Sequence, residues 1–165
     1  MDHKLRIRPA RDADLPAITA IYAAARKFMA ENGNPTQWYG GYPDETVIRS
    51  DIEKQQLYVC TDGDAVVGVF CYFFGIEPDY LDIYHGAWQC DAPYGVVHRV
   101  ASTAKQRGIA SFCLDYAFSQ CGNLRIDTHR DNIPMQRLLE KNGFQRCGIV
   151  HCSHGGERIA YQKTQ

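Results

Sequence analysis

The chain has 165 residues, of which 45% are hydrophobic and 22% charged, and this composition fits one globular domain with a substantial core. Its formal net charge of −1 indicates neither the basic footprint of a nucleic-acid-binding protein nor a strongly acidic surface. No apolar run approaches the roughly 20 residues that span a bilayer, and Met1 to Arg11 lacks the apolar core of a signal peptide. We therefore expect a cytoplasmic protein, one domain over residues 1–165, that binds neither nucleic acid nor membranes.

The N-terminal half alternates between strand and helix patterns. Alternating polar and apolar residues predict strands, three-and-four apolar spacing predicts helices, and Asp62-Gly63 is a hairpin signal. The expected elements are a strand at Lys4–Arg8, a helix capped by Asp12 and ended by Asn32 and Gly33, a weaker helix from Asp44 to about Gln56, and strands at Leu57–Cys60 and Ala65–Phe74.

The C-terminal half continues the pattern after a segment, Glu77–Pro93, to which we assign no regular structure. The expected elements are a strand at Tyr94–Ser102, a helix at Gly108–Gln120, a strand at Leu124–His129, a helix capped by Asn132 and stopped by Gly143, and an antiparallel pair at Phe144–His151 and Arg158–Gln162. One mixed sheet with helices on both faces is the simplest architecture for this order.

The 7 cysteines are spread over expected strands and helices, which is typical of reduced core thiols rather than of a disulfide framework. Cys147, His151, Cys152 and His154 lie close together in the sequence. Their spacing matches no usual zinc pattern, and alternate residues of a strand point to opposite faces. We therefore expect no metal site.

The segment from His98 to Ala110 predicts a strand that turns directly into a helix. Gly108 and Ala110 are small, and Lys105 and Arg107 add positive charge. Free backbone N–H groups at a helix start favour an anion, so the segment resembles a pyrophosphate cradle. Neither the Walker pattern nor the dinucleotide fingerprint is present. An ordinary basic turn remains the alternative.

This turn also carries a family resemblance. Lys105 to Ala110 is similar to the acyl-CoA signature Q/R-x-x-G-x-G/A of the GNAT superfamily, with Lys at the first position. Asn132 to Phe144 is similar to the next family segment, an Asn, a helix and a terminal Gly-Phe, and IRPARDADLPAI is similar to the opening strand and helix. The chain therefore resembles a GNAT N-acetyltransferase over nearly its whole length.

The resemblance implies a single-domain α/β fold with a mixed, mostly antiparallel sheet, helices on both faces, and splayed fourth and fifth strands. It also implies acetyl-CoA as the acyl donor, with a backbone N–H near Val100 or Ala101 binding the developing oxyanion. The implied acyl-CoA contacts are Val100, Ala101, Lys105, Gln106, Arg107, Gly108, Ile109, Ala110 and Asn132. Many members have a Tyr acid where this chain has Leu139, so a non-catalytic acyl-CoA-binding or sensing module is an alternative.

Amine attack on a thioester needs a group that removes a proton. His98 lies in the expected fourth strand, and Asp127 and His129 share one face of the fifth, where a buried polar group needs a partner or a function. Histidine titrates nearest neutrality. We predict His98, Asp127 and His129 as the catalytic set, with Glu77 and Asp82 as weaker candidates for the base. The alternative is a structural network in which Asp127 pairs with Arg125 or Arg99.

The acceptor is expected to be the primary amine of a small molecule. Arg99 and Arg125 could receive a carboxylate in two-point geometry, which suggests a zwitterionic or amino-acid-like acceptor. Trp38, Tyr42 and Tyr84 could form aromatic walls, although aromatic rings also fill cores. A protein acceptor is the alternative, and a homodimer is compatible with these features.

Overall fold

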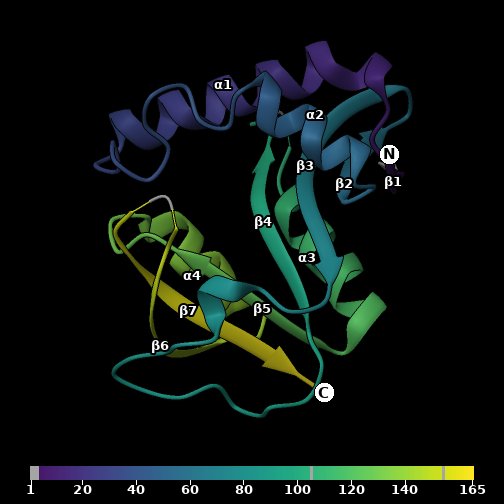
Figure 1. Cartoon of the computed structure of the whole chain (residues 1–165). Helices are drawn as coiled ribbons and strands as arrows, with labels where there is room; N and C mark the ends of the chain where they lie inside the picture. The colour runs from purple at the N-terminus through teal and green to yellow at the C-terminus, as the bar shows by residue number, and fades with distance from the viewer. Residues whose placement is uncertain (1–3, 105, 154) are drawn as a thin grey trace. The chain divides into compact units, whose positions relative to one another are not determined.

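The computed structural model of the protein describes residues 4–104, 106–153 and 155–165. The strands are β1 (Leu5–Pro9), β2 (Leu57–Asp62), β3 (Ala65–Phe74), β4 (Gly95–Ser102), β5 (Asn123–Thr128), β6 (Gln145–His151) and β7 (Glu157–Thr164) (Figure 1). The helices are α1 (Leu15–Glu31), α2 (Glu45–Glu53), α3 (Ile109–Cys121) and α4 (Ile133–Lys141), with short 3-10 turns η1 (Asp12–Asp14) and η2 (Pro78–Tyr80). Among the described residues, no helix is long and apolar enough to cross a bilayer.

The strands form a seven-stranded sheet in the order β1-β2-β3-β4-β5-β7-β6. Strands β4 and β5 are parallel, and the pairs β1–β2, β2–β3, β5–β7 and β6–β7 are antiparallel. The parallel ladder joins only Gly95 to Leu124 and Val96 to Arg125. These findings confirm the mixed, mostly antiparallel sheet, and the short parallel ladder agrees with the expected splayed fourth and fifth strands.

The chain divides into two compact units. Unit 1 contains the described residues up to Tyr72 together with Arg99–Tyr116, and unit 2 contains Phe73–His98 and Ala117–Gln165. Strands β3 and β4 and helix α3 each contribute to both units.

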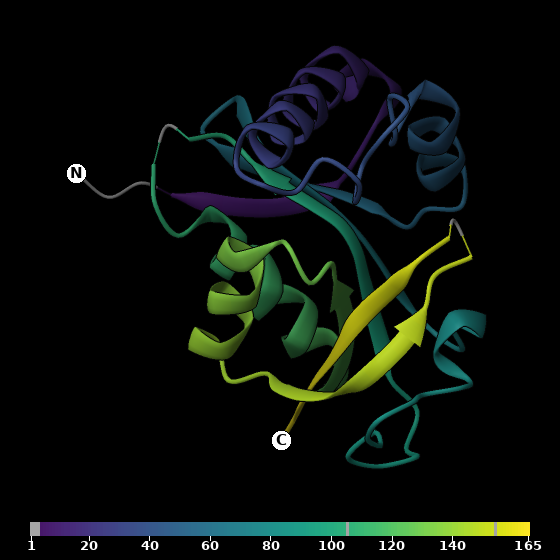
Figure 2. The same ribbon diagram turned by 90° about the vertical axis from the view of Figure 1, so that its left-hand side faces the viewer.

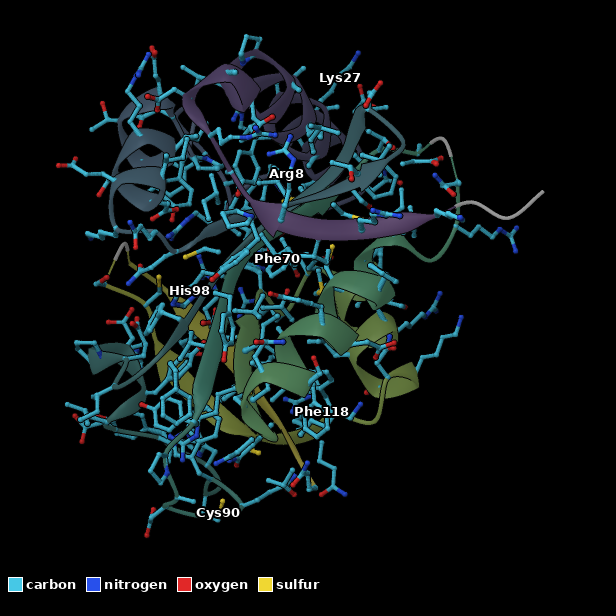
Figure 3. All side chains as sticks on the ribbon, turned by 90° about the vertical axis from the view of Figure 1, so that its right-hand side faces the viewer. Arg8, Lys27, Phe70, Cys90, His98 and Phe118 are labelled. Atoms are coloured by element: carbon cyan, nitrogen blue, oxygen red, sulfur yellow. The ribbon has the colours of Figure 1, made fainter. Side chains whose placement is uncertain are left out.

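In unit 1, helices α1 and α2 lie on one face of the strands and α3 lies on the other (Figures 2 and 3). The apolar spacing that predicts α1 buries Ile18, Ile21 and Tyr22. On the α3 face, the ring of Tyr58 stacks on Phe70 at 5.6 Å between centroids. Unit 1 therefore has helices on both faces of its strands, as expected.

The start of α1 differs in detail from the prediction. Asp12 begins a 3-10 turn instead of capping the helix, and α1 begins at Leu15. Asp14 accepts hydrogen bonds from both Nη atoms of Arg8, at 2.7 and 2.8 Å, so its carboxylate ties the turn to β1. The predicted cap of α2 is confirmed, because the Asp44 side chain accepts from the Val47 amide at 3.0 Å.

In unit 2, helix α4 lies on one face of β5, β7 and β6 (Figure 2). The segment between β3 and β4 packs on the other face, where Tyr80 and Tyr94 join Val96, Val150 and Ala160 in one hydrophobic core. This segment has little regular structure, as expected, but it contains η2 and an isolated bridge between Tyr84 and Ile149. The strand β7 lies between β5 and β6, an order that the sequence pattern does not specify.

Candidate active site

Gly108 opens the turn that leads from β4 into α3. Its φ of +87° lies in the left-handed region that favours glycine, and an added Cβ would meet no atom within 4 Å. The amide of Phe112 donates to the Gly108 carbonyl at 2.9 Å, so helical hydrogen bonding begins at this glycine. The first-turn amides lack intrahelical partners and lie at the positive end of the helix dipole. This backbone is suited to an anion.

Two features hold this turn within unit 1. Gln106 Nε2 donates to Asp62 Oδ2 at 2.9 Å, which anchors the turn to the end of β2. A Cβ at Gly68 would lie 2.8 Å from Cγ2 of Ile109, so a glycine in β3 lets the start of α3 approach closely. Neither Asp62 nor Gly68 belongs to the signature that the sequence presents.

The other predicted acyl-CoA contacts have different surroundings. Arg107 is exposed, Ala110 is half-buried, and Lys105 lies outside the described residues. In unit 2, the Asn132 side chain accepts from the Met135 amide at 3.2 Å and therefore serves as the predicted cap of α4. The structure thus places the predicted turn contacts together in unit 1.

Arg99 interrupts β4 with a left-handed backbone conformation. Its φ is +51°, which is uncommon for a residue other than glycine. The hydroxyl of Tyr22 donates to the Arg99 carbonyl at 2.8 Å and holds this conformation. Val100 and Ala101, the predicted neighbourhood of an oxyanion donor, follow directly and are buried. Local departures of this kind re-aim the neighbouring backbone groups, as bulges do beside active sites.

The guanidinium of Arg99 is already paired inside unit 1. Its Nε and Nη2 donate to the two carboxylate oxygens of Asp51, both at 2.9 Å, and its Nη1 donates to the Tyr42 hydroxyl at 3.0 Å. Burial opposes the positive charge, but Cys71, Asp51 and Tyr42 outweigh it and raise the pKa of Arg99. The ion-pair partner of Arg99 is therefore Asp51 of α2.

Three predicted acceptor residues meet around this pair. The Trp38 ring lies 6.5 Å from the Tyr42 ring and 5.5 Å from Tyr22, measured between centroids. Trp38, Tyr42 and Arg99 therefore form one polar-aromatic cluster in unit 1. Tyr84 belongs to unit 2, where its ring packs against His151 at 5.0 Å.

In unit 2, Tyr80 connects two of the predicted catalytic residues. Its hydroxyl donates to Asp127 Oδ2 at 2.6 Å, and its ring lies 6.1 Å from the His98 ring. Burial, with the Asp127 carboxylate, raises the pKa of Tyr80, so its phenol remains a donor. Figure 3 labels His98 on β4. Its Nε2 lies 3.6 Å from Oε1 of Glu77. His98 and Asp127 therefore share one network.

Arg125 lies within the interior of unit 2. Its side chain is only 4% exposed, and its guanidinium carbon lies 4.1 Å from the Trp88 ring centroid and 3.9 Å from that of Tyr94. Nη2 donates to the Cys90 carbonyl at 2.8 Å, and burial lowers the pKa of Arg125. This geometry anchors the segment between β3 and β4, and favours that role over carboxylate recognition.

His129 directly follows the last residue of β5. Its Nδ1 accepts from the Asp131 amide at 3.0 Å. Burial, then the charges of Arg158 and Arg130, lower the pKa of His129, while Asp131 opposes the shift. The imidazole is therefore neutral at pH 7 and able to accept a proton. It lines a groove of about 470 Å³ whose other lining residues are Arg130, Arg146, Ile149, Gly156, Glu157, Arg158 and Ile159.

Two further positions bear on the sequence analysis. Leu139, at the family's Tyr position, is 0% exposed in α4 and is part of the core of unit 2. His154, one of the residues weighed as a metal ligand, lies outside the described residues. Among the residues that the structure does describe, no three His, Cys, Asp or Glu side chains gather as a metal site would require.

Several residues of these networks carry no recognisable sequence signal. Asp51 occupies an unremarkable helix position, and Tyr80 is one of several aromatics in an unassigned segment. Arg158 lies near the start of β7 with no motif around it. Glu77, which lies beside His98, is one of the two weaker base candidates that the sequence offers. Partners that lie far apart in the sequence are found only from the fold.

Comparison with known proteins agrees with this geometry. No protein-family model and no curated protein matches the sequence. Among solved structures, a GNAT-family acetyltransferase from Streptococcus agalactiae is 31% identical over 98% of this chain and 95% of that chain, with a TM-score of 0.90. A ribosomal-protein-alanine N-acetyltransferase from Brucella melitensis is 21% identical over 97% and 99%, with a TM-score of 0.66. The NatC complex bound to Gag peptide and CoA is 14% identical over 98% and 99%, with a TM-score of 0.60.

The last two similarities concern the fold alone. The first extends to the sequence over nearly the whole of both chains. The fold is that of an acyltransferase. The chain belongs to the GNAT family of acetyltransferases.

Proposed function

We propose that this protein transfers an acetyl group from acetyl-CoA to the primary amine of a small molecule. The observation that carries the proposal is the turn at Gly108, which opens α3 with free space beside its Cα in a chain of the GNAT family. We retain the cytoplasm as the compartment, because all 7 cysteines are free thiols, which persist in reducing surroundings.

The residues of unit 1 fit the anionic part of the donor. Gly108 allows close approach to the backbone, and the amides of Ile109 and Ala110 begin the helix. Exposed Arg107 adds positive charge beside them. Gln106 contributes through its backbone, because its side chain is held by Asp62. Acetyl-CoA, when bound, supplies a thioester carbonyl, and backbone amides at Val100 or Ala101 would stabilise negative charge on its oxygen.

The network of unit 2 supplies candidates for the proton acceptor. Nε2 of His98 faces Glu77, so this carboxylate can stabilise the imidazolium that forms when His98 accepts a proton. The Tyr80 hydroxyl donates to Oδ2 of Asp127 and orients this carboxylate. The other oxygen, Oδ1, can then accept from an ammonium group. The lowered pKa of His129 keeps its imidazole neutral at pH 7, which is the form that can accept a proton. We propose His98 first, with Asp127 as its partner in the network and His129 as the second candidate.

We propose a narrower set of acceptor contacts than the sequence suggests. Trp38 and Tyr42 remain candidates for an aromatic wall in unit 1, and Tyr84, 47% exposed, remains one in unit 2. Arg99 acts through Asp51 and Tyr42, and we propose it as a positioning residue of the cluster. Arg125 is proposed to fix the segment between β3 and β4.

A turnover assay tests the proposal. The full chain is incubated with acetyl-CoA and a panel of amino acids, small amines and peptides with free N-termini, and thiol release and acetylated product are measured together. We expect product with small amines. Product only with peptides would replace the acceptor class. Stabilisation by acetyl-CoA without turnover on any amine would instead support a binding module, which the buried Leu139 makes reasonable.

A further inference from the structure

The groove beside His129 is rich in positive charge. Three arginines, Arg130, Arg146 and Arg158, line it with the imidazole of His129, and Glu157 supplies the one carboxylate of its lining. These cations come from the turn after β5, from β6 and from β7, all within unit 2. The lining therefore carries a net positive charge even when His129 is neutral.

Arg158 has few protein partners for its guanidinium. It is only 7% exposed, and among the described residues its guanidinium has one hydrogen bond, from Nη1 to the adjacent Glu157 carbonyl at 3.0 Å. A nearly buried guanidinium is costly unless an anion or several acceptors compensate it. By contrast, the buried guanidinium of Arg99 has both oxygens of Asp51. Arg158 thus lines the groove with only one of its guanidinium donors used by a described residue.

Gly156 keeps the space for this guanidinium. It has φ +91°, and an added Cβ would lie 3.3 Å from Nη1 of Arg158. The glycine therefore permits both the hairpin conformation and the position of the arginine. Ile149 and Ile159 give the groove an apolar part. A volume of about 470 Å³ lies in the range of small-molecule sites.

We propose that this groove of unit 2 binds a small organic dianion, a phosphate monoester or a dicarboxylate, through Arg130, Arg146 and Arg158. Guanidinium groups pair with both phosphate and carboxylate in two-point geometry, and the isoleucines would contact the apolar body of the ligand. The residues that line the groove belong to unit 2, whereas the turn at Gly108 belongs to unit 1.

The bound dianion would act on His129. The charged groups that face this imidazole are Arg158 from β7 and Arg130 and Asp131 from its own segment, with Arg146 and Glu157 elsewhere in the groove. The arginines lower the pKa of His129, so an anion that compensates them should raise it. The imidazole therefore reports occupancy of the groove without any measurement of turnover.

The test follows the His129 imidazole by NMR in the full chain, assigned with a His129→Gln variant. Phenyl phosphate and succinate are titrated separately at constant ionic strength set with chloride. We expect a saturable shift and a raised pKa of His129 with at least one probe. A shift with only one probe assigns the ligand to that class, and a shift with both assigns the shared dianion chemistry.

Variants connect the signal to the arginines. Arg158→Met and, separately, Arg146→Gln should each weaken binding by about tenfold or more, since each removes a charge-assisted contact. Arg146 is exposed, so its variant remains informative if Arg158→Met fails to fold. Arg49→Gln is the matched control, because it removes an exposed arginine of α2 that pairs with Glu45. No saturable shift with either probe, or equal binding by Arg146→Gln and Arg49→Gln, would overturn the proposal.

Discussion

The turn before α3 and the groove beside His129 both suit anions, but they do so with different groups. The turn presents backbone amides beside Gly108, with the Gln106 side chain held by Asp62 and exposed Arg107 adding charge. The groove presents side-chain guanidiniums from three separate segments. A backbone site depends on conformation and tolerates many side chains, whereas a side-chain site depends on the individual residues. The turn should therefore be sensitive to substitutions that change its backbone conformation, and the groove to substitutions that remove a guanidinium.

The largest effect is expected from the side chains proposed to move the proton. His98→Asn, Asp127→Asn or His129→Asn should lower turnover by about 10²–10⁴ when the residue changed is the general base. Stabilisation by acetyl-CoA should persist, because none of the three lies in the turn. Steady-state kinetics on the best acceptor provides the measurement. His85→Asn is the control, since His85 is exposed at φ +58°, a conformation that Asn tolerates. Near-normal turnover in all three variants would move the base to Glu77 or Asp82.

Leu139, at the position of the family's Tyr, should behave as a core residue when it is substituted. Leu139→Ala removes a fully buried side chain of α4 and should lower the free energy of unfolding by about 2–5 kcal/mol. Ile133→Ala, in the same helix at 45% exposure, should cost much less. Urea denaturation of both variants gives the comparison. A Leu139→Ala protein that keeps its stability and loses turnover would show that this position serves the chemistry.

Binding of acetyl-CoA at the turn should depend on the backbone conformation at Gly108. At about a hundredfold excess over the dissociation constant, acetyl-CoA should stabilise the fold by about 2.7 kcal/mol. Gly108→Asp should abolish this gain, because it adds a Cβ and a negative charge where an anion is proposed to bind. Gly63→Asp provides the matched control, with φ +59° and the same open surroundings in the β2–β3 turn. Thermal unfolding with and without acetyl-CoA measures both. Equal stabilisation of the two variants by acetyl-CoA would show that the donor does not bind at this turn.

The smallest effect concerns protonation in the groove. The pKa of His129 is lowered in the folded state, so between its folded and unfolded values the unfolded chain binds more protons. Stability should therefore fall as the pH drops below about 6.5, the ordinary histidine value, and this loss should be reduced in His129→Gln. Unfolding curves from pH 7.5 to 5 would show the difference. Identical slopes in the two proteins would mean that the arginines do not act on this imidazole.

The difference between the two regions also explains what sequence reasoning could reach. The turn is contiguous, so Gly108 and its neighbours present both a physical pattern and a family signature. The strands and helices follow from periodicity, and the caps Asp44 and Asn132 from local chemistry. The position of β7 between β5 and β6 follows from neither.

Long-range pairing is what sequence reasoning missed. Arg99 and Arg125 look like equivalent buried arginines, yet one pairs with Asp51 from α2 and the other is enclosed by Trp88 and Tyr94. Nothing local distinguishes an arginine with an internal partner from one, like Arg158, that has few acceptors. Such pairings depend on which segments the sheet brings together, and periodicity does not report them.

Acetyl transfer itself is tested most directly with acetyl-CoA labelled with ¹³C at the thioester carbonyl. The full chain is followed by ¹³C NMR with an amine acceptor, and Gly108→Asp reports the rate without the proposed turn. We expect the thioester signal to be replaced by an amide carbonyl signal in wild type, and much more slowly in the variant. Conversion to free acetate, or an amide that forms equally fast in both proteins, would contradict an N-acetyltransferase whose donor binds at this turn.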